Sequence, residues 1–406
     1  MSETSKKRKN VMSRGFLTLM IAYTLACTGY QFLSTMITSY GTEVLCFSKV
    51  TIASITGSIA IAGLCMRPIS AVVVDKFNKR NFYAFTIVGV ALSVFLFSVF
   101  TSYTGLYAAQ IVRGVFWALM STSGLVMVSE MVDRDDLGVA MGIYALGQVI
   151  AKSIGATIAL SLANRFSFVI AFRIGSCVCV LGALLILTIP YEKSTANKDA
   201  SVIETIKNIR FRNIFAVETA PIAVLNFMYQ MLQTSLGSYV IAYARAELNL
   251  ANIGVFATIS NTIMWVTRPL FGKISDKYGV KWCFIPSSIG FVVTCLILAT
   301  TNGMTGIILA ACVYGAVTGG CMPMTKAVAI KTVEPERRGV ATSTNSIGAD
   351  VGLLSSNMVI AGVATAFSTY RASYYFMAGV AIVSLIFTVI YFTIYNKKHP
   401  GNVLGW

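Results

Sequence analysis

The feature that most constrains this chain is a series of apolar runs, each about 20 residues long. Residues 82–101 and 283–301 contain no charged side chain, and only 12% of the 406 residues are charged. A run of about 20 apolar residues is long enough to cross the hydrocarbon core of a bilayer as an α-helix. The runs lack the alternation of apolar and polar residues that marks a membrane β-barrel. The pattern therefore predicts an all-α membrane protein.

The apolar runs recur along the whole chain and predict twelve membrane-spanning helices. The first run follows a basic segment, but it is too long for the core of a secretory signal and has no small-residue cleavage pattern, so it is expected to be the first span. The nine cysteines show no zinc or disulfide spacing, and we expect no metal site and no cofactor. The predicted spans are about 15–38, 51–73, 82–101, 104–128, 138–162, 168–190, 213–241, 252–273, 282–301, 304–328, 339–363 and 372–396.

The net charge of +16 follows this topology. With the N-terminus inside, the inner segments hold 22 Lys and Arg residues and the outer segments hold 4. An excess of Lys and Arg in the inner loops sets the orientation of a membrane protein. The distribution predicts a multi-pass protein of a bacterial-type cell membrane with both termini in the cytoplasm. It also argues against nucleic acid as a partner.

An internal repeat divides the chain into two halves. The stretch "RPISAVVVDKFNKR" (67–80) returns 201 positions later as "RPLFGKISDKYGVK" (268–281), and "GVA" at 138–140 returns at 339–341. At an offset of 199, "YQFLST" (30–35) is echoed by "YQMLQT" (229–234). Parallel halves that rock against each other around a central site are typical of secondary transporters. The alternative is a duplicated scaffold that transports nothing. The predicted units are a six-helix bundle at 1–190, a cytoplasmic linker at 191–212 and a second six-helix bundle at 213–406.

The repeated turn carries a family resemblance. "GKISDKYGVK" (272–281) fits the pattern Gly-x-x-x-Asp-Arg/Lys-x-Gly-Arg/Lys-Arg/Lys, and "AVVVDKFNKR" (71–80) fits it with Ala71 and Asn78 in the glycine places. With twelve spans and the repeat, the chain resembles the major facilitator superfamily over essentially its whole length. The preceding Arg-Pro resembles the efflux, metallophore-exporter and oxalate-exchanger branches. The resemblance implies a secondary active transporter, and we expect a monomer in the lipid bilayer.

The resemblance also bears on single residues. In the oxalate branch the arginine of the Arg-Pro pattern, here Arg268, is implicated in anion binding, but that branch's partner lysine falls near Asn345. A structural role near the inner mouth is the alternative for Arg268. In the fifth span the antiporter-type pattern Gly-x-x-x-Gly-Pro-x-x-Gly reads "GQVIAKSIG" (147–155), with Ala151 in place of a glycine and Lys152 in place of the proline. A lysine there suggests an anionic group on the substrate or an internal ion pair.

The repeated turn also has a physical interpretation. Gly279 can supply the positive φ that a sharp turn between helices needs, and Asn78 is the next most tolerant residue. Asp75 and Asp276 can pair with basic residues or cap a neighbouring helix, which would hold one conformation together. The alternative is a basic turn that only sets topology. The predicted conformational latch comprises Arg67, Asp75, Lys76, Arg80, Arg268, Asp276, Lys277 and Gly279.

Polar residues at helical spacing mark one face on each of four spans. These faces are Thr24, Thr28, Gln31 and Thr35; Gln110, Arg113, Trp117 and Ser121; Tyr144, Gln148 and Lys152; and Asn226, Gln230 and Gln233. In lipid such faces must point into the bundle, and an ionisable residue at membrane depth indicates function. Arg113 and Lys152 are the deep cations, whereas Arg67, Arg268 and Lys326 lie within about two turns of the inner surface and could snorkel. The alternative for these polar faces is hydrogen bonding between helices. The predicted substrate site comprises Arg113 and Lys152 with Gln31, Gln110, Trp117, Tyr144, Gln148, Gln230 and Gln233.

Two acidic residues are candidates for proton coupling, with Asp350 deep in the eleventh span and Glu218 near the inner end of the seventh. Near Lys152 or Arg113, Asp350 would instead be one member of an ion pair. We expect a transporter of a small organic solute, with a mild preference for an anion, coupled to protons or to a counter-substrate. The alternative is a proton-driven exporter of cationic amphiphiles. In that case Asp350 would recognise the cation, and the aromatic rings of Trp117, Tyr30 and Tyr229 would stack on it. A channel or scramblase fits two rocking halves poorly, and no nucleophile and base set suggests an enzyme.

Overall fold

The computed structural model describes residues 13–190, 215–240, 243–244, 247–250 and 254–398, and in these residues all regular elements are helices. The predicted linker at 191–212 lies outside them. The first half contains α1 (Arg14–Ser39), η1 (Tyr40–Val44), α2 (Lys49–Lys76), α3 (Lys79–Leu96), α4 (Tyr103–Met131), η2 (Arg134–Asp136), α5 (Leu137–Ile150), η3 (Ala151–Gly155), α6 (Ala156–Arg165) and α7 (Phe168–Leu187). The second half contains η4 (Val217–Thr219), α10 (Ala220–Ser238), α12 (Gly254–Tyr278), α13 (Lys281–Thr300), α14 (Met304–Lys331), η5 (Pro335–Arg337), α15 (Arg338–Phe367) and α16 (Tyr370–Lys398).

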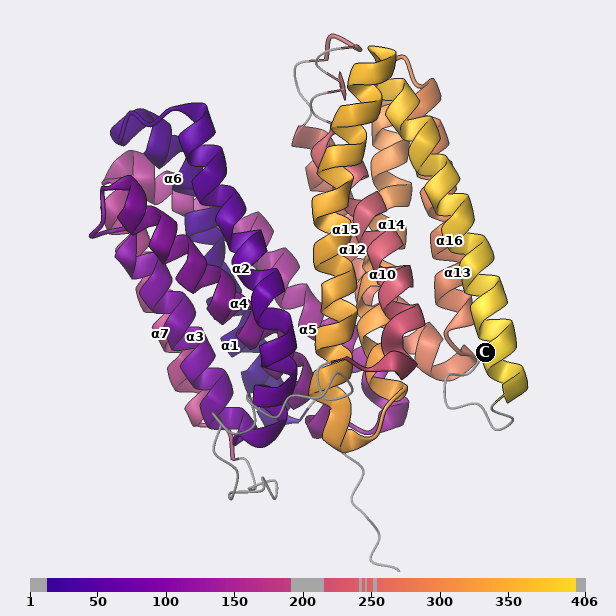
Figure 1. Ribbon diagram of the computed structural model, residues 1–406, viewed down its shortest axis with the longest axis horizontal. Coiled ribbons are helices and arrows are strands. Elements are labelled where there is room, and N and C mark those ends of the chain that lie inside the picture. Colours follow the sequence, from indigo (N-terminus) through magenta and orange to yellow (C-terminus); the bar gives the residue numbers. More distant parts are fainter. Residues whose placement is uncertain (1–12, 191–214, 241–242, 245–246, 251–253, 399–406) are drawn as a thin grey trace, which may run out of the picture.

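The helices form two bundles, one from each half of the chain (Figure 1). Because α5, η3 and α6 together make the fifth span, the described residues contain all twelve predicted spans. Nine of these spans are long and apolar enough to cross a membrane on length and composition alone. Helices α10 and α12 carry polar and charged side chains that face the space between the bundles, and α2 contributes Arg67 to it.

Short polar side chains fix the starts of several helices. The hydroxyls of Ser48, Ser102 and Ser167 each accept a hydrogen bond from the backbone N–H three residues on, as N-caps do. Asn78 behaves in the same way: its φ is −60° and its side chain caps α3. The prediction that Asn78 supplies a positive φ is therefore wrong. Gly279 does have a positive φ, 95°, where α12 turns into α13.

The sequence repeat returns as a repeat of helix contacts. A Cβ on Gly114 would lie 2.6 Å from the carbonyl oxygen of Ile59, because α2 and α4 approach closely there. A Cβ on Gly315 would lie 2.5 Å from the carbonyl oxygen of Ser260, at the matching crossing of α12 and α14. Both residues of the second pair lie 201 positions after those of the first. The two halves therefore share one packing scheme.

The outer surface of the bundles is apolar. Large side chains such as Val266, Leu181 and Phe85 are more than half exposed and face away from the bundle interiors. Such exposure would be costly in water but is expected against lipid tails. The surface thus agrees with a multi-pass membrane protein.

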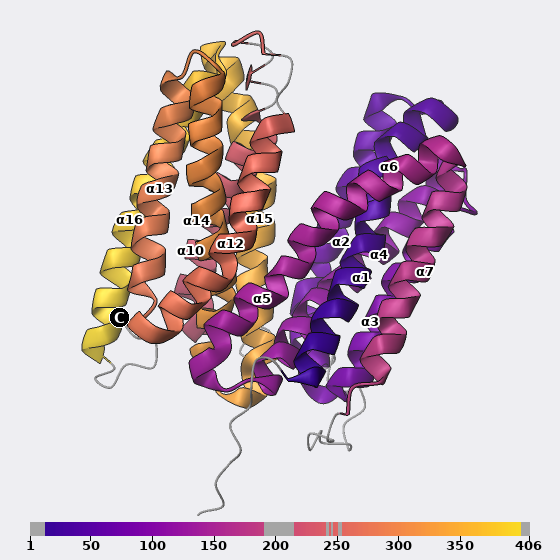
Figure 2. The same ribbon diagram turned by 180° about the vertical axis from the view of Figure 1, so that it is seen from behind.

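The bundles converge at one end of the molecule, which we call the basic end (Figures 1 and 2). At that end α5 packs on α12 and α14, and α2 and α4 pack on α15. The ribbons diverge toward the opposite, far end. The basic end is defined by Lys79, Arg80, Lys277, Lys281, Lys331, Arg337 and Arg338.

Candidate functional site

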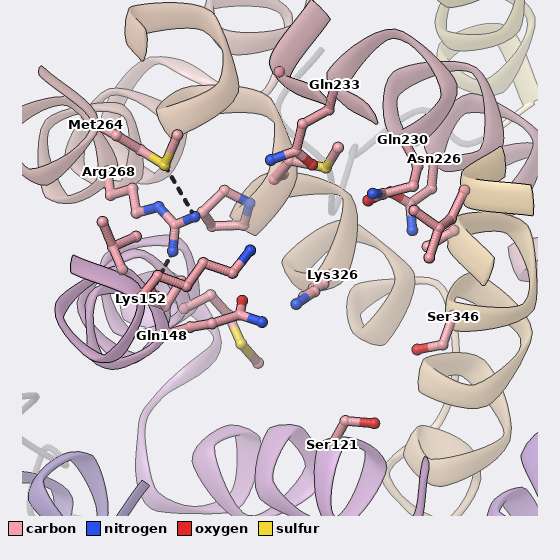
Figure 3. Close-up of a pocket in the computed structure, with 18 of the residues that line it drawn as sticks. Ser121, Gln148, Lys152, Asn226, Gln230, Gln233, Met264, Arg268, Lys326 and Ser346 are labelled. Carbon is pink, nitrogen blue, oxygen red and sulfur yellow. Dashed lines mark hydrogen bonds between the residues drawn. The ribbon is translucent and has the colours of Figure 1, made fainter. Parts of the chain in front are cut away.

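A cavity of about 390 Å³ lies between the two bundles. Both halves of the chain line it, so any change in the angle between the bundles changes its shape. Polar side chains from α4, α5, α10, α12, α14 and α15 surround the space (Figure 3). The polar and charged lining residues are Tyr23, Arg67, Trp117, Ser121, Tyr144, Gln148, Lys152, Asn226, Gln230, Gln233, Ser260, Asn261, Arg268, Tyr314, Lys326, Ser346 and Asp350.

The cavity carries an excess of positive charge. Its described lining contains two arginines and two lysines but a single carboxylate, that of Asp350. The lone carboxylate is already paired with Arg67, which leaves Lys152, Arg268 and Lys326 without an acidic partner in this lining. Figure 3 shows the ammonium groups of both lysines directed into the same space.

Arg67 of α2 and Asp350 of α15 form an ion pair across the two bundles. The guanidinium Nε lies 2.7 Å from Oδ2 of Asp350, and Nη1 lies 2.7 Å from the hydroxyl of Ser121 on α4. The Arg67 carbonyl oxygen also accepts a hydrogen bond from Ser343 of α15. Arg67 therefore does not snorkel to the surface; it is buried and holds α2 and α4 against α15.

Asp350 thus has a different partner from the two that the sequence suggested. The expected cations were Lys152 or Arg113, but Arg67 occupies the carboxylate. The cause is the position of α15, which packs on α2 and α4 of the first bundle. A role for Asp350 in proton coupling stays a prediction.

Arg268 of α12 occupies the place in the second bundle that Arg67 occupies in the first. Its Nη1 donates to the carbonyl oxygen of Ala145 on α5, and its Nη2 lies 3.3 Å from the sulfur of Met264. Its Nε is buried without a hydrogen-bond partner. Arg268 therefore joins α12 to α5 across the bundles and also lines the cavity.

The predicted polar face of the fifth span does line the cavity. Tyr144, Gln148 and Lys152 all contribute to the wall. Tyr144 is fixed by a 2.9 Å hydroxyl contact to Tyr83 and by stacking on Tyr23 at 4.0 Å. Lys152 lies in the π-helical turn η3, at the place where the antiporter-type pattern has proline. Such wide turns are frequent at functional sites.

Lys326 is a third cavity residue, with Arg67 and Arg268, that the sequence interpretation placed within reach of the inner surface. It could have snorkelled there, but it lines the cavity from α14. Asn226, Gln230 and Gln233 of α10 face the same space, as the stripe on that span predicted. The available signal for Lys326 was its charge inside an otherwise apolar span.

The face on α4 divides into two parts. Trp117 lines the cavity, stacked on Tyr30 at 4.0 Å, and Ser121 also lines it. Arg113 does not line it: its guanidinium lies 3.8 Å from the Tyr30 ring centre and donates to the carbonyl oxygen of Tyr30 and to Ser34. The prediction of Arg113 as a cavity residue is wrong, because α1 covers this part of α4.

Two glutamines of the predicted substrate site, Gln110 and Gln31, also form hydrogen bonds within the first bundle. Gln110 is buried and accepts a hydrogen bond from Arg113 at 3.2 Å. Gln31 donates to Thr35 on its own helix at 3.1 Å. Neither contributes to the cavity lining. Both serve contacts within the first bundle.

Asp276 joins the bundles at the basic end. Its carboxylate accepts hydrogen bonds from the backbone N–H groups of Gly138 and Val139, at 3.0 and 2.8 Å, in the first turn of α5. Lys331 of α14 lies 3.4 Å away. Gly138 permits this approach, since a Cβ there would lie 2.7 Å from the carboxylate. A residue of the second bundle thus caps a helix of the first.

The other residues of the predicted latch do not all take part. Arg80 donates to the carbonyl oxygen of Ile189 within its own bundle, and Lys277 is exposed beside Tyr278. The side chains of Asp75 and Lys76 lie outside the described part of the structure.

Two further contacts of arginine side chains lie at the basic end. Arg338 of α15 donates to the carbonyl oxygen of Ser129 on α4 at 2.7 Å, which again links the bundles. Glu218 lies in η4, before α10 begins, and pairs with Arg337 at 2.9 Å. The seventh span therefore starts later than predicted, and Glu218 is at the surface and not in the cavity. Among the described residues, no group of three metal-ligating side chains occurs.

Comparison with known proteins identifies the family. The model of the Major Facilitator Superfamily matches residues 19–251 and 222–404. An uncharacterized MFS-type transporter of Methanocaldococcus jannaschii is 22% identical over 377 residues, covering 88% of this chain and 94% of the relative. Multidrug resistance protein MdtG of Proteus mirabilis is 23% identical over 339 residues, covering 80% of this chain and 81% of the relative.

Solved structures agree on the fold. The human organic anion transporter MFSD10 superimposes with a TM-score of 0.79 at 12% identity, covering 92% of this chain and 98% of the other. FucP in the outward conformation gives 0.76 at 15% identity with the same coverage. At these identities the likeness concerns the fold alone. The two bundles, the cavity between them and the family match together show that the chain belongs to the Major Facilitator Superfamily and is a membrane transporter.

Proposed function

We propose that this protein is a secondary transporter of a small organic anion, moved by alternating access through the cavity between the bundles. The observation that carries this proposal is the charge of the cavity: Lys152, Arg268 and Lys326 have no carboxylate partner in the described lining. Unpaired cations in a confined, weakly solvated space favour an anionic ligand.

The placement of these cations suits a substrate that bridges the bundles. Lys152 comes from the first bundle, whereas Arg268 and Lys326 come from the second. A bound anion would therefore be shared by the two moving parts. The fork of Arg268 suits a carboxylate or phosphate, and its buried, unpartnered Nε is a donor that such a group could satisfy. Gln148, Gln230 and Gln233 would supply neutral hydrogen bonds around it.

The proposal includes an orientation in the cell membrane. The rule that Lys and Arg gather on the inner side puts the basic end, and with it both termini, in the cytoplasm. The bundles meet at that end and diverge at the far end. In this orientation the structure represents an outward-facing state, with Asp276, Arg338 and the Arg67–Asp350 pair as its inner closure.

Export of cationic compounds is the second candidate, and the similarity to MdtG favours it. Two observations weigh against it. Asp350, which would read the cation, is engaged by Arg67. Tyr229, expected to stack on the cation, is fully buried, lies 2.8 Å from Ser288 and is not part of the cavity lining.

Ligand-induced thermal stabilisation of the purified protein separates the two candidates. A panel would contain organic anions, zwitterions and cationic drugs. We expect the anions to raise the melting temperature, and Lys152→Gln and Lys326→Gln to reduce that rise. Lys273→Gln is the matched control, because Lys273 is an exposed lysine of α12 outside the cavity lining.

The opposite result would be a shift by cations alone that disappears in Asp350→Asn. It would show that the carboxylate and not the basic cluster recognises the substrate, and the export proposal would replace this one.

A further inference from the structure

The two arginines that the repeat relates, Arg67 and Arg268, have different partners in the other bundle. Arg67 and Arg268 are related by the 201-residue repeat, and each reaches across to a helix of the other bundle. Arg67 finds Asp350 on α15. The position on α5 that corresponds to Asp350, 201 residues earlier, is Val149. The repeat thus gives one arginine a carboxylate and gives the other an apolar side chain.

The geometry shows that Val149 faces the same site. Arg268 donates to the carbonyl oxygen of Ala145, one helical turn before Val149. Both Ala145 and Val149 line the cavity beside Arg268. A carboxylate at position 149 would therefore lie on the cavity wall next to the arginine. Its absence leaves the cavity with three cations that no described lining residue neutralises.

Those cations matter most when the cavity closes. In the outward-facing state water from the open side can solvate them. Reorientation requires an occluded intermediate, and removing unpaired charges from water is costly unless an opposite charge accompanies them. A bound anion supplies that charge, whereas an empty cavity does not.

We propose that this carrier reorients only with an anion bound, so that it is an exchanger in which the counter-substrate is a second small organic anion. The inference rests on the proposed function and adds the mode of coupling to it. The missing carboxylate at position 149 is the element of the sequence that enforces exchange. Placing a carboxylate there should allow the empty carrier to close.

The first test measures closure of the protein without any substrate. Spin labels at Gly57→Cys on α2 and Gly362→Cys on α15 would report the separation of the bundles on the far side of the Arg67–Asp350 pair. Both positions are suitable, since an added Cβ meets no atom within 4 Å at either. The exposed native cysteines Cys46, Cys65 and Cys177 would first be replaced by serine.

The distances would be recorded in lipid discs, in a zwitterionic buffer free of phosphate, sulfate and carboxylates. We expect one long distance in the unmodified cavity and a second, shorter distance in Val149→Asp. Val149→Asn is the matched control, because it has the same shape without the charge, and should resemble the unmodified cavity. Lys326→Met lowers the cavity charge by a different route and should also populate the short distance.

A flux assay supplies the second test. Vesicles containing the protein would be loaded with unlabelled oxalate, succinate or inorganic phosphate, or left empty, and given the same labelled anion outside. We expect uptake into loaded vesicles to exceed uptake into empty ones by about tenfold or more, and this ratio to fall toward one in Val149→Asp.

The outcomes separate the two proposals. Equal uptake into loaded and empty vesicles would overturn exchange while leaving anion transport intact. Lack of uptake of all three probes would count against the proposed function for these anions. The spin-label distances decide about exchange even then: a short distance in the ligand-free, unmodified cavity overturns it. A single long distance in both Val149→Asp and Lys326→Met would overturn it as well.

Discussion

The contact between Asp276 and α5 gives the sharpest prediction about the basic end, where the two bundles meet. Helix α5 has no cap of its own, because Asp136 at its N-cap position makes no side-chain capping bond. The N–H groups of Gly138 and Val139 would have no acceptor within their helix. Asp276 of the other bundle satisfies both, and its side chain is only 9% exposed. Asp276→Ala should therefore loosen the basic end.

The size of the effect follows from these bonds. A hydrogen bond to a charged group contributes about 1.5–3 kcal/mol net, and loss of an N-cap costs about 0.5–2 kcal/mol. The ion pair with Lys331 is longer, 3.4 Å, and adds little. Since the contributions overlap, we expect a loss of about 2–4 kcal/mol in the free energy of local opening. That corresponds to about a 30- to 1,000-fold increase in the opening equilibrium.

Hydrogen exchange of the backbone amides measures this opening directly. The amides of Gly138 and Val139 should exchange faster in Asp276→Ala by roughly the factor above, while those in the core of α13 should not change. Asp276→Asn should give a smaller increase, because its amide retains one acceptor oxygen. Lys277→Ala is the control, since Lys277 is the exposed neighbour on the same turn. Unchanged exchange at these two amides in Asp276→Ala would refute the assignment of Asp276 as the cap.

Two further predictions concern contacts nearer the cavity. Asp350→Asn should destabilise the protein by about 3–5 kcal/mol, because it leaves the Arg67 guanidinium buried without a counter-charge. Adding Arg67→Met to the same chain should recover part of the loss. Denaturation midpoints of the two single variants and the double variant measure this. Gly142→Ala should separate α5 from α12 and lower the melting temperature, since its Cβ would lie 2.5 Å from the carbonyl oxygen of Arg268. Gly362→Ala is the control, because an added Cβ there meets no atom within 4 Å, and it should have little effect on the melting temperature. Equal effects of the two alanines would contradict the close packing.

The helical spacing of polar residues predicted part of the cavity correctly. Tyr144, Gln148 and Lys152 share a face on the fifth span, and all three line the cavity. Gln230 and Gln233 do so on the seventh. These predictions succeeded because lipid excludes polar side chains, so a polar stripe on a spanning helix must face the protein interior or water.

The same logic failed for Arg113. Periodicity shows which residues share a face with Trp117, but it does not show which helix covers that face. Here α1 covers the part of this α4 face that carries Arg113, and its guanidinium donates hydrogen bonds to Tyr30 and Ser34 of α1. The interpretation of Lys326 erred in the opposite direction. Its distance from the end of its span suggested that it could snorkel, whereas it lines the cavity.

The sequence by itself determined the membrane class, the twelve spans and the duplicated architecture. Span length, charge and repeats are properties of the chain alone, and the bilayer imposes one structural solution on them. Only the tertiary structure decided which charges meet. The pairing of Arg67 with Asp350 and the capping of α5 by Asp276 both join residues of different bundles. Such contacts depend on how the two bundles approach each other, which no local sequence pattern specifies.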